Sequence, residues 1–215
     1  ISGIEYCFLA TIFLTGFFIT FNHQIVQTVF QRGAFDYEAT LKVKNILIAY
    51  AIGIPFYLYR DLLVRTYYSI EKTKLPFQLS LTGIILNIFF DWFLIGAPIK
   101  NFGNLSPYNF GVVGIILSSV IVNFIVCIFL SFNLRNEDIH LPNLDLFKKI
   151  TLMSLAASID STLCLNILKS TNNFNSNFGE FLLLIFGSLI FFLIYFLLTK
   201  YLKVNKFKIY QKEFN

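Results

Sequence analysis

Long apolar runs alternate with short polar segments along this chain of 215 residues. A helix needs about 20 apolar residues to cross a bilayer, at about 1.5 Å of rise per residue. The runs come close to that length and predict six spans, at residues 6–30, 43–68, 77–95, 110–134, 147–168 and 178–201. The predicted fold class is therefore an all-α, polytopic bundle of transmembrane helices.

The scarcity of charge excludes other classes of protein. Asp, Glu, Lys and Arg make up 13% of the residues, whereas an average soluble domain has about 25%. So few charged groups cannot cover a globular surface. This excludes a soluble enzyme and a nucleic-acid-binding domain, and we expect no nucleic acid as a partner.

The distribution of basic residues predicts the topology. Twelve of the seventeen Lys and Arg residues lie in or beside the segments that follow the second, fourth and sixth spans. Basic residues gather on the cytoplasmic side of membrane proteins, so both ends of the chain are predicted to be cytoplasmic. The basic tail at residues 204–215 is interpreted as a topology anchor in preference to a segment that grips lipid head groups.

The chain begins at Ile1 and leads almost directly into an apolar run, without the features of a signal peptide. We therefore expect a fragment that starts inside a longer protein. Cys7, Cys127 and Cys164 all lie within apolar runs, which favours buried thiols over disulfides or metal ligands. Neither a metal nor a cofactor is expected, and the sequence contains no motif for nucleotide hydrolysis or other catalysis.

Two of the predicted spans contain residues that interrupt a helix. Asn22, His23 and Gln24 divide the first span, so we expect a break there or a turn along the membrane interface. Gly53 and Pro55 lie in the middle of the second span. Proline removes a backbone donor and kinks a helix, and a membrane helix tolerates this when a neighbour satisfies the freed carbonyl group.

Three charged side chains lie near the end of the second span. Asp61 and Arg65 are four residues apart, so they share a helix face and can pair. Arg60 lies about 100° away around the helix and needs another partner. Arginine binds phosphate oxygens through two parallel hydrogen bonds, so these residues predict a cationic cavity for an anionic substrate. Alternatively, they reach out to the membrane interface. Both interpretations stay open for Arg60, and the second is preferred for Arg65.

Polar residues also lie within the third, fourth and fifth spans. Asn87 and Asp91 are four residues apart on one helix face. The start of the fourth span has a face of small residues, which permits close helix packing and consists of Gly111, Gly114, Ser118 and Ser119. Asp160 lies near the middle of the fifth span. A carboxylic acid at this depth favours its neutral form, which makes Asp160 a candidate proton or cation site. A hydrogen bond between helices is the preferred alternative.

A series of motifs resembles one protein family. Residues 29–36 read V-F-Q-R-G-A-F-D and are similar to the F-x-R-G-A-F motif of the MurJ/MviN family of lipid II flippases. Further motifs match in the same order at residues 49–55 (A-Y-A-I-G-I-P), 63–69 (L-V-R-T-Y-Y-S), 72–76 (K-T-K-L-P) and 111–114 (G-V-V-G). Lys72 and Leu75 depart from the family pattern. The motif residues are Arg32, Gly33, Phe35, Gly53, Pro55, Tyr68 and Pro76.

The resemblance implies a MOP-type fold of fourteen helices, in two lobes of six plus a C-terminal pair. Residues 1–134 then supply four helices of the C-terminal lobe, and residues 135–203 supply the pair, which flanks a groove for a lipid tail. The implied function is to move a peptidoglycan precursor, linked to undecaprenyl pyrophosphate, across the bacterial plasma membrane by alternating access during cell wall biogenesis. The implied partners are membrane lipids, this precursor and the missing N-terminal helices of the same protein.

The candidate substrate-binding residues are Arg60, Asp61, Arg65, Asn87, Asp91 and Asp160. A flippase of this kind needs arginines in its cavity, whereas a cation-coupled drug exporter of the same superfamily needs acidic residues there. Another MOP-type exporter, of polysaccharide-linked lipid or of drugs, and an inactive membrane fragment are therefore kept as alternatives.

Overall fold

The computed structural model describes residues 2–30, 36–96, 108–135, 144–171 and 177–201, and within these ranges it contains helices and turns but no strand. Its elements are α1 (Ser2–Thr20), α2 (Asn22–Phe30), α3 (Tyr37–Ser69), α4 (Lys74–Ile95), α5 (Val112–Arg135), α6 (Leu144–Thr171) and α7 (Asn177–Tyr201). Five of them are long and apolar enough to cross a membrane, and α1 together with α2 forms a sixth, bent candidate. The predicted all-α class is confirmed, and the predicted spans correspond to these helices.

The predicted break in the first span is confirmed. α1 and α2 are bent by 71° at Phe21, directly before the polar residues 22–24. α2 packs against α3 and α7, and Gln24 is buried there. The bend thus lies where the polar segment begins, and α2 keeps Gln24 inside the bundle.

α3 begins six residues earlier than the predicted span, at Tyr37. Asp36 caps the helix by accepting a hydrogen bond of 2.8 Å from the backbone N–H of Ala39, and Glu38 lies in the first turn. A capping side chain and negative charge both stabilise the start of a helix. The helix therefore includes polar residues that the apolar run left out.

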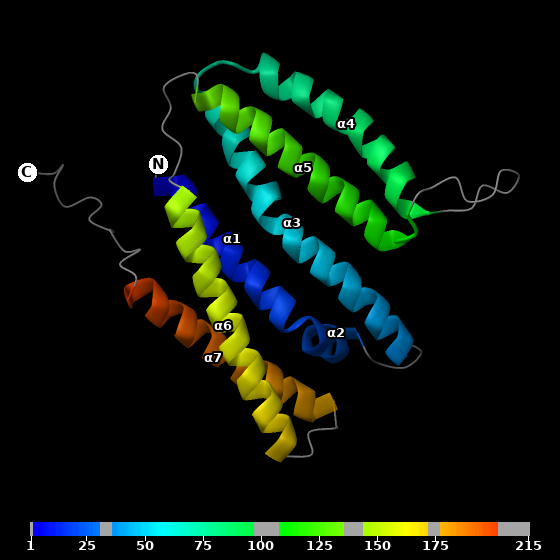
Figure 1. Ribbon diagram of the computed structural model, residues 1–215, viewed down its shortest axis with the longest axis vertical. Coiled ribbons are helices and arrows are strands. Elements are labelled where there is room, and N and C mark those ends of the chain that lie inside the picture. The colour runs from blue at the N-terminus through cyan, green and yellow to red at the C-terminus, as the bar shows by residue number, and fades with distance from the viewer. Residues whose placement is uncertain (1, 31–35, 97–107, 136–143, 172–176, 202–215) are drawn as a thin grey trace, which may run out of the picture.

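The helices lie side by side in the order α4, α5, α3 and α1, followed by α6 and α7 (Figure 1). α5 lies between α3 and α4, although α3 and α4 are consecutive in the chain. α1 packs against α3 on one side and against α6 on the other. α1, together with α2, which packs against α3 and α7, therefore links the layer formed by α3, α4 and α5 to the pair formed by α6 and α7.

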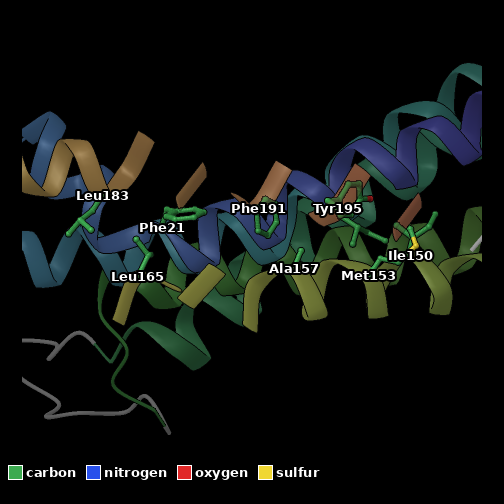
Figure 2. Close-up of a cluster of buried hydrophobic side chains, with 9 residues drawn as sticks. Phe21, Ile150, Met153, Ala157, Leu165, Leu183, Phe191 and Tyr195 are labelled. Atoms are coloured by element: carbon green, nitrogen blue, oxygen red, sulfur yellow. The ribbon is translucent and has the colours of Figure 1, made fainter. Parts of the chain in front are cut away.

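The two largest groups of buried side chains hold these neighbours together. One group includes Leu63 and Tyr67 of α3 with Leu130 of α5. The other joins α1 to α6 and α7, and Figure 2 shows Phe21, at the bend after α1, and Phe191 of α7 within it. Side chains that interlock in this way fix which faces of the helices meet.

α4 packs against α5 and leaves much of its surface uncovered by the other described helices. Ile84, Ile85 and Ile88 are 60%, 69% and 66% exposed. In a helix that spans a membrane, such apolar side chains face the acyl chains or further helices rather than water.

A neighbouring helix satisfies the carbonyl group freed by Pro55, as the sequence predicts. Pro55 has no N–H, so the carbonyl oxygen of Ala51, four residues earlier, lacks its usual partner within α3. The Thr15 hydroxyl of α1 donates a hydrogen bond of 3.0 Å to that oxygen. The same hydroxyl lies 2.9 Å from the carbonyl oxygen of Thr11 in its own helix, so one proton serves two acceptors. This bond ties α1 to α3 at the proline.

α4 and α5 approach each other closely at Gly114, on the face that the sequence predicts for packing. A Cβ atom at this position would lie 2.7 Å from the carbonyl oxygen of Leu94, a backbone atom that cannot turn aside. Gly96 ends α4 in the left-handed conformation, with φ of 74°, and the N–H of Phe110 then donates to the same Leu94 oxygen at 3.0 Å. Glycine at position 114 is thus required by the crossing of the two helices.

We expect Thr15→Val to destabilise the protein by about 1 kcal/mol, because it leaves the Ala51 carbonyl group without a donor where no water replaces it. Valine keeps the shape of threonine, so packing changes little. The matched control is Thr20→Val, because the Thr20 hydroxyl donates to Gly16 in its own helix, at 2.7 Å. Thermal unfolding in detergent measures both variants, and equal shifts in Tm would contradict this role of Thr15.

We expect Gly114→Ala to destabilise the contact of α4 with α5 by about 1–3 kcal/mol, the usual cost of overpacking. Gly83→Ala is the control in the same helix pair, because its Cβ would lie 3.4 Å from Val122, an ordinary contact. Alanine also favours helix over glycine by about 1 kcal/mol, so Gly83→Ala should be neutral or stabilising. Denaturant titration of both variants tests this, and tolerance of alanine at position 114 would show that the helices can separate there freely.

Candidate functional site

Polar side chains from three neighbouring helices meet within the layer formed by α3, α4 and α5. α3 contributes one of them, and α4 and α5 contribute three each. We call this set the polar belt, and it consists of Arg60, Ser80, Asn87, Asp91, Ser118, Ser119 and Asn123. It has two hydrogen-bonded groups, one around Arg60 and one around Asp91, which α5 connects.

Arg60 reaches from α3 across α5 to α4. Its Nη1 donates a hydrogen bond of 2.9 Å to Oδ1 of Asn123, and its Nη2 donates one of 3.3 Å to Oγ of Ser80. Asn123 is itself held, because its Nδ2 donates to the Ser119 carbonyl oxygen of α5 at 2.7 Å. The guanidinium group is half-buried and has two neutral partners, and within the described residues no carboxylate pairs with it. Five N–H donors are available on an arginine, so its charge and further donors remain for a ligand.

The second group joins α4 to α5 at Ser118. The hydroxyl of this serine is fully buried; it contacts Oδ1 of Asp91 and lies 3.2 Å from Oδ1 of Asn87. Nδ2 of Asn87 lies 3.4 Å from Oγ of Ser119. The sequence prediction that Asn87 and Asp91 share one helix face is confirmed, and that face meets the small residues of α5.

The two groups differ in the ligands they suit. A guanidinium group matches phosphate or carboxylate oxygens. The group around Asp91 presents carboxylate, amide and hydroxyl oxygens, which are the ligand types that hard cations take. Among the described residues there is no cluster of three or more His, Cys, Asp or Glu side chains that could hold a metal ion.

The structure places Asp61 and Arg65 outside this belt. Both side chains are exposed, and in the described part of the chain no ion pair joins them. Sharing a helix face allows a pair but does not enforce it, because an exposed ion pair contributes little free energy. The ion pair that the spacing allows is thus not formed. Of Arg60, Asp61 and Arg65, Arg60 is the residue whose side chain makes hydrogen bonds to other described helices.

Asp160 lies on α6, which packs against α1 and α7 rather than against the helices of the belt. Its side chain is exposed and makes no hydrogen bond or ion pair with any described residue. The hydrogen bond between helices that the sequence suggests is therefore not formed within these helices. Nearby Ser158 and Ser161 bond instead to carbonyl groups of α6 itself, at 2.8 and 3.0 Å.

The motif residues have mainly structural positions. Gly53 is buried against Val120 of α5, and Pro76 is buried in the first turn of α4. Tyr68 is exposed at the end of α3. The motif positions 32, 33 and 35 lie outside the described residues.

Sequence reasoning missed two members of the belt, Ser80 and Asn123. Asn123 lies within the apolar stretch from Val120 to Leu130 of the fourth predicted span, and an amide at membrane depth is a signal for a partner on another helix. Ser80 gives no such signal, because a single serine bonds readily to its own helix. Only the crossing of α3, α4 and α5 brings both to Arg60.

Comparison with known proteins identifies related sequences. The family described as "Lipid II flippase MurJ" matches residues 1–187. A probable lipid II flippase MurJ from Synechocystis is 38% identical over 122 residues, which is 57% of this chain and 21% of that protein. The lipid II flippase MurJ of Thermosipho africanus is 33% identical over 135 residues, 61% of this chain and 24% of that protein.

A solved structure is also similar. Lipid II flippase MurJ in an inward closed conformation superposes with a TM-score of 0.68 at 27% identity, and the match covers 94% of this chain and 38% of that one. The described helices thus reproduce a part of that transporter fold. The chain spans between a fifth and a quarter of the length of the two relatives above.

Proposed function

Because the chain belongs to the MurJ family of lipid II flippases, we propose that it forms the C-terminal part of a transporter that moves lipid II across the bacterial plasma membrane. Lipid II is a lipid-linked precursor whose head group is anionic and polar, while its tail is apolar. An apolar bilayer opposes passage of such a head group. A path through a protein must therefore offer polar groups at membrane depth.

The observation that carries the proposal is the environment of Arg60. Two neutral side chains on two other helices hold its guanidinium group, at 2.9 and 3.3 Å, and no carboxylate in the described ranges neutralises it. A charge at this depth is costly without a function or a partner. We infer that Arg60 binds the pyrophosphate of lipid II, with Asn123 and Ser80 as the residues that position it.

The arrangement of the helices supports separate roles for the two parts of the chain, one for the head group and one for the lipid tail. Residues 1–134 supply four helices of a transport lobe, and residues 135–203 supply a pair that flanks the path of the lipid tail. α1 belongs to the lobe through α3 and to the pair through a shared apolar core. The lobe is completed, and a second lobe is provided, by further helices of the same transporter, consistent with the 38% of the solved MurJ that the match covers.

The excess of basic residues after the second, fourth and sixth spans supports an orientation with both chain ends in the cytoplasm. The ends of α3 and α5 and the start of α4 then lie on the cytoplasmic side. The opposite orientation would place most of the basic residues outside.

The position of Asp160 bears on the rival function, a cation-coupled drug exporter. That function requires acidic residues in the transport path, and Asp160 is exposed on α6, away from the belt. Asp91 is the carboxylate within the belt, and it contacts Ser118. Because Ser118 already bonds to Asp91 and Asn87, while no described carboxylate pairs with Arg60, the belt supports an anionic substrate at Arg60 over a cationic drug.

A complementation experiment tests the function. A chimera in which this chain replaces the matching C-terminal part of the Thermosipho africanus flippase is expected to restore growth of a bacterium depleted of its own lipid II flippase. The 215-residue chain alone should not, because six spans cannot form two lobes that move against each other. Growth with the chain alone, at equal amounts of membrane-inserted protein, would contradict the two-lobe arrangement.

Within that chimera, we expect Arg60→Gln to lower lipid II translocation at least about tenfold, a loss of about 1.4 kcal/mol in transition-state stabilisation. Arg65→Gln is the matched control, because it removes the same charge from an exposed position on the same helix. Translocation is measured as the appearance of labelled head group on the outer surface of vesicles, normalised to protein amount. Similar activity of the two variants would exclude Arg60 as the pyrophosphate ligand.

A further inference from the structure

A second polar feature lies at the turn between α3 and α4, apart from the belt. An open pocket there is lined by Tyr68, Thr73, Lys74 and Phe77. None of these residues belongs to the polar belt. The pocket therefore needs its own explanation, which goes beyond the transport function proposed above.

A tight turn forms the pocket. Backbone N–H groups of Glu71 and Lys72 donate to the carbonyl oxygens of Tyr68 and Tyr67, at 3.1 and 3.0 Å. Glu71 adopts the left-handed conformation, with φ of 59°. This geometry reverses the chain within four residues between the end of α3 and Lys74, the first residue of α4. The last turn of α3 and the first turn of α4 thereby line one pocket.

The polar groups of the pocket are available to a ligand. The hydroxyl groups of Tyr68 and Thr73 and the ammonium group of Lys74 have no side-chain partner among the described residues. Thr73 precedes α4 but does not cap it through its side chain, and the first N–H groups of a helix lack partners within that helix. One cation and two hydroxyl groups beside a helix start suit the oxygens of a phosphate group.

The charge of the turn favours the same ligand. Arg65, Lys72 and Lys74 are all exposed, and Glu71 is the one acidic residue between positions 65 and 74. An anionic group is therefore attracted to the turn before it reaches the pocket.

The position of the pocket identifies the source of the phosphate. Because α3 and α4 are each long and apolar enough to cross the membrane, we expect the turn that joins them to lie at its surface. The rings of Tyr68 and Phe77 are 54% and 63% exposed, and aromatic side chains with an apolar neighbourhood on one side and water on the other are typical of the membrane interface. We propose that this pocket binds the phosphate of an anionic phospholipid through Lys74, Thr73 and Tyr68, while the two rings contact the glycerol and upper acyl region.

Lipid binding to the full 215-residue chain in detergent tests the proposal. Native mass spectrometry compares occupancy by phosphatidylglycerol and phosphatidylcholine with identical acyl chains. The unmodified chain should bind phosphatidylglycerol preferentially, and Lys74→Gln should reduce that preference about fivefold, the factor expected for one lysine charge at a membrane surface. Circular dichroism confirms that the variants keep their helix content.

Lys72→Gln is the matched control, because it removes the same charge from the same turn at a residue that does not line the pocket. It should change the lipid preference less than twofold. Equal losses in the two variants would mean that the turn attracts anions only diffusely, and the pocket would be rejected as a site. Absence of any preference in the unmodified chain would also overturn the proposal.

Two further measurements distinguish a lipid from a free phosphate. Inorganic phosphate in large excess should not displace phosphatidylglycerol, because it lacks the glycerol and acyl groups that contact the rings; displacement would overturn the assignment to a lipid. Phe77→Ser should weaken binding of both lipids without changing the ratio between them. An unchanged occupancy in Phe77→Ser would remove the aromatic contact from the proposal and contradict it.

Discussion

A polar group inside a bilayer has no water to bond, so it must find its partner within the protein. In this chain the partners come from neighbouring helices as well as from the same helix. Thr15 serves the carbonyl group freed by Pro55, Tyr67 of α3 donates to a carbonyl group of α5 at 2.9 Å, and Tyr195 of α7 donates to one of α1 at 2.9 Å. Each bond helps to set how two apolar helices are aligned along their axes, because apolar packing alone constrains that alignment only weakly.

The polar belt follows from the same constraint, and it also holds a charged residue. Ser118, Asn87 and Asp91 satisfy one another across α4 and α5, so that part of the belt is closed on itself. Arg60 is different, because its neutral partners hold the guanidinium group without cancelling its charge. No carboxylate among the described residues pairs with this group, and this distinguishes Arg60 from the exposed Asp61 and Arg65 of the same helix.

α1 lies between the α3–α5 layer and the α6–α7 pair. It shares a polar bond with α3 at the proline kink, and it shares an apolar core with α6 and α7. Its contact with α6 is close, since Ser154 donates to the carbonyl oxygen of Ile12 at 3.1 Å and lies against Gly16. α1 and α2 therefore connect the α3–α5 layer to the α6–α7 pair, because α2 also packs against both α3 and α7.

The sequence by itself determined the features that depend on local order along the chain. Apolar runs specify the spans, the polar residues 22–24 specify the bend after α1, and four-residue spacing puts Asn87 and Asp91 on one face. The tertiary structure alone decided which faces meet, because residues as distant as Arg60 and Asn123 share no local pattern. It also decided that Asp61, Arg65 and Asp160 remain exposed, since a charged residue in a span has several possible partners and helix packing selects among them. Composition and periodicity thus predict a bundle of membrane helices. The packing order α4, α5, α3, α1 then brings polar residues that are distant in the sequence together in the polar belt.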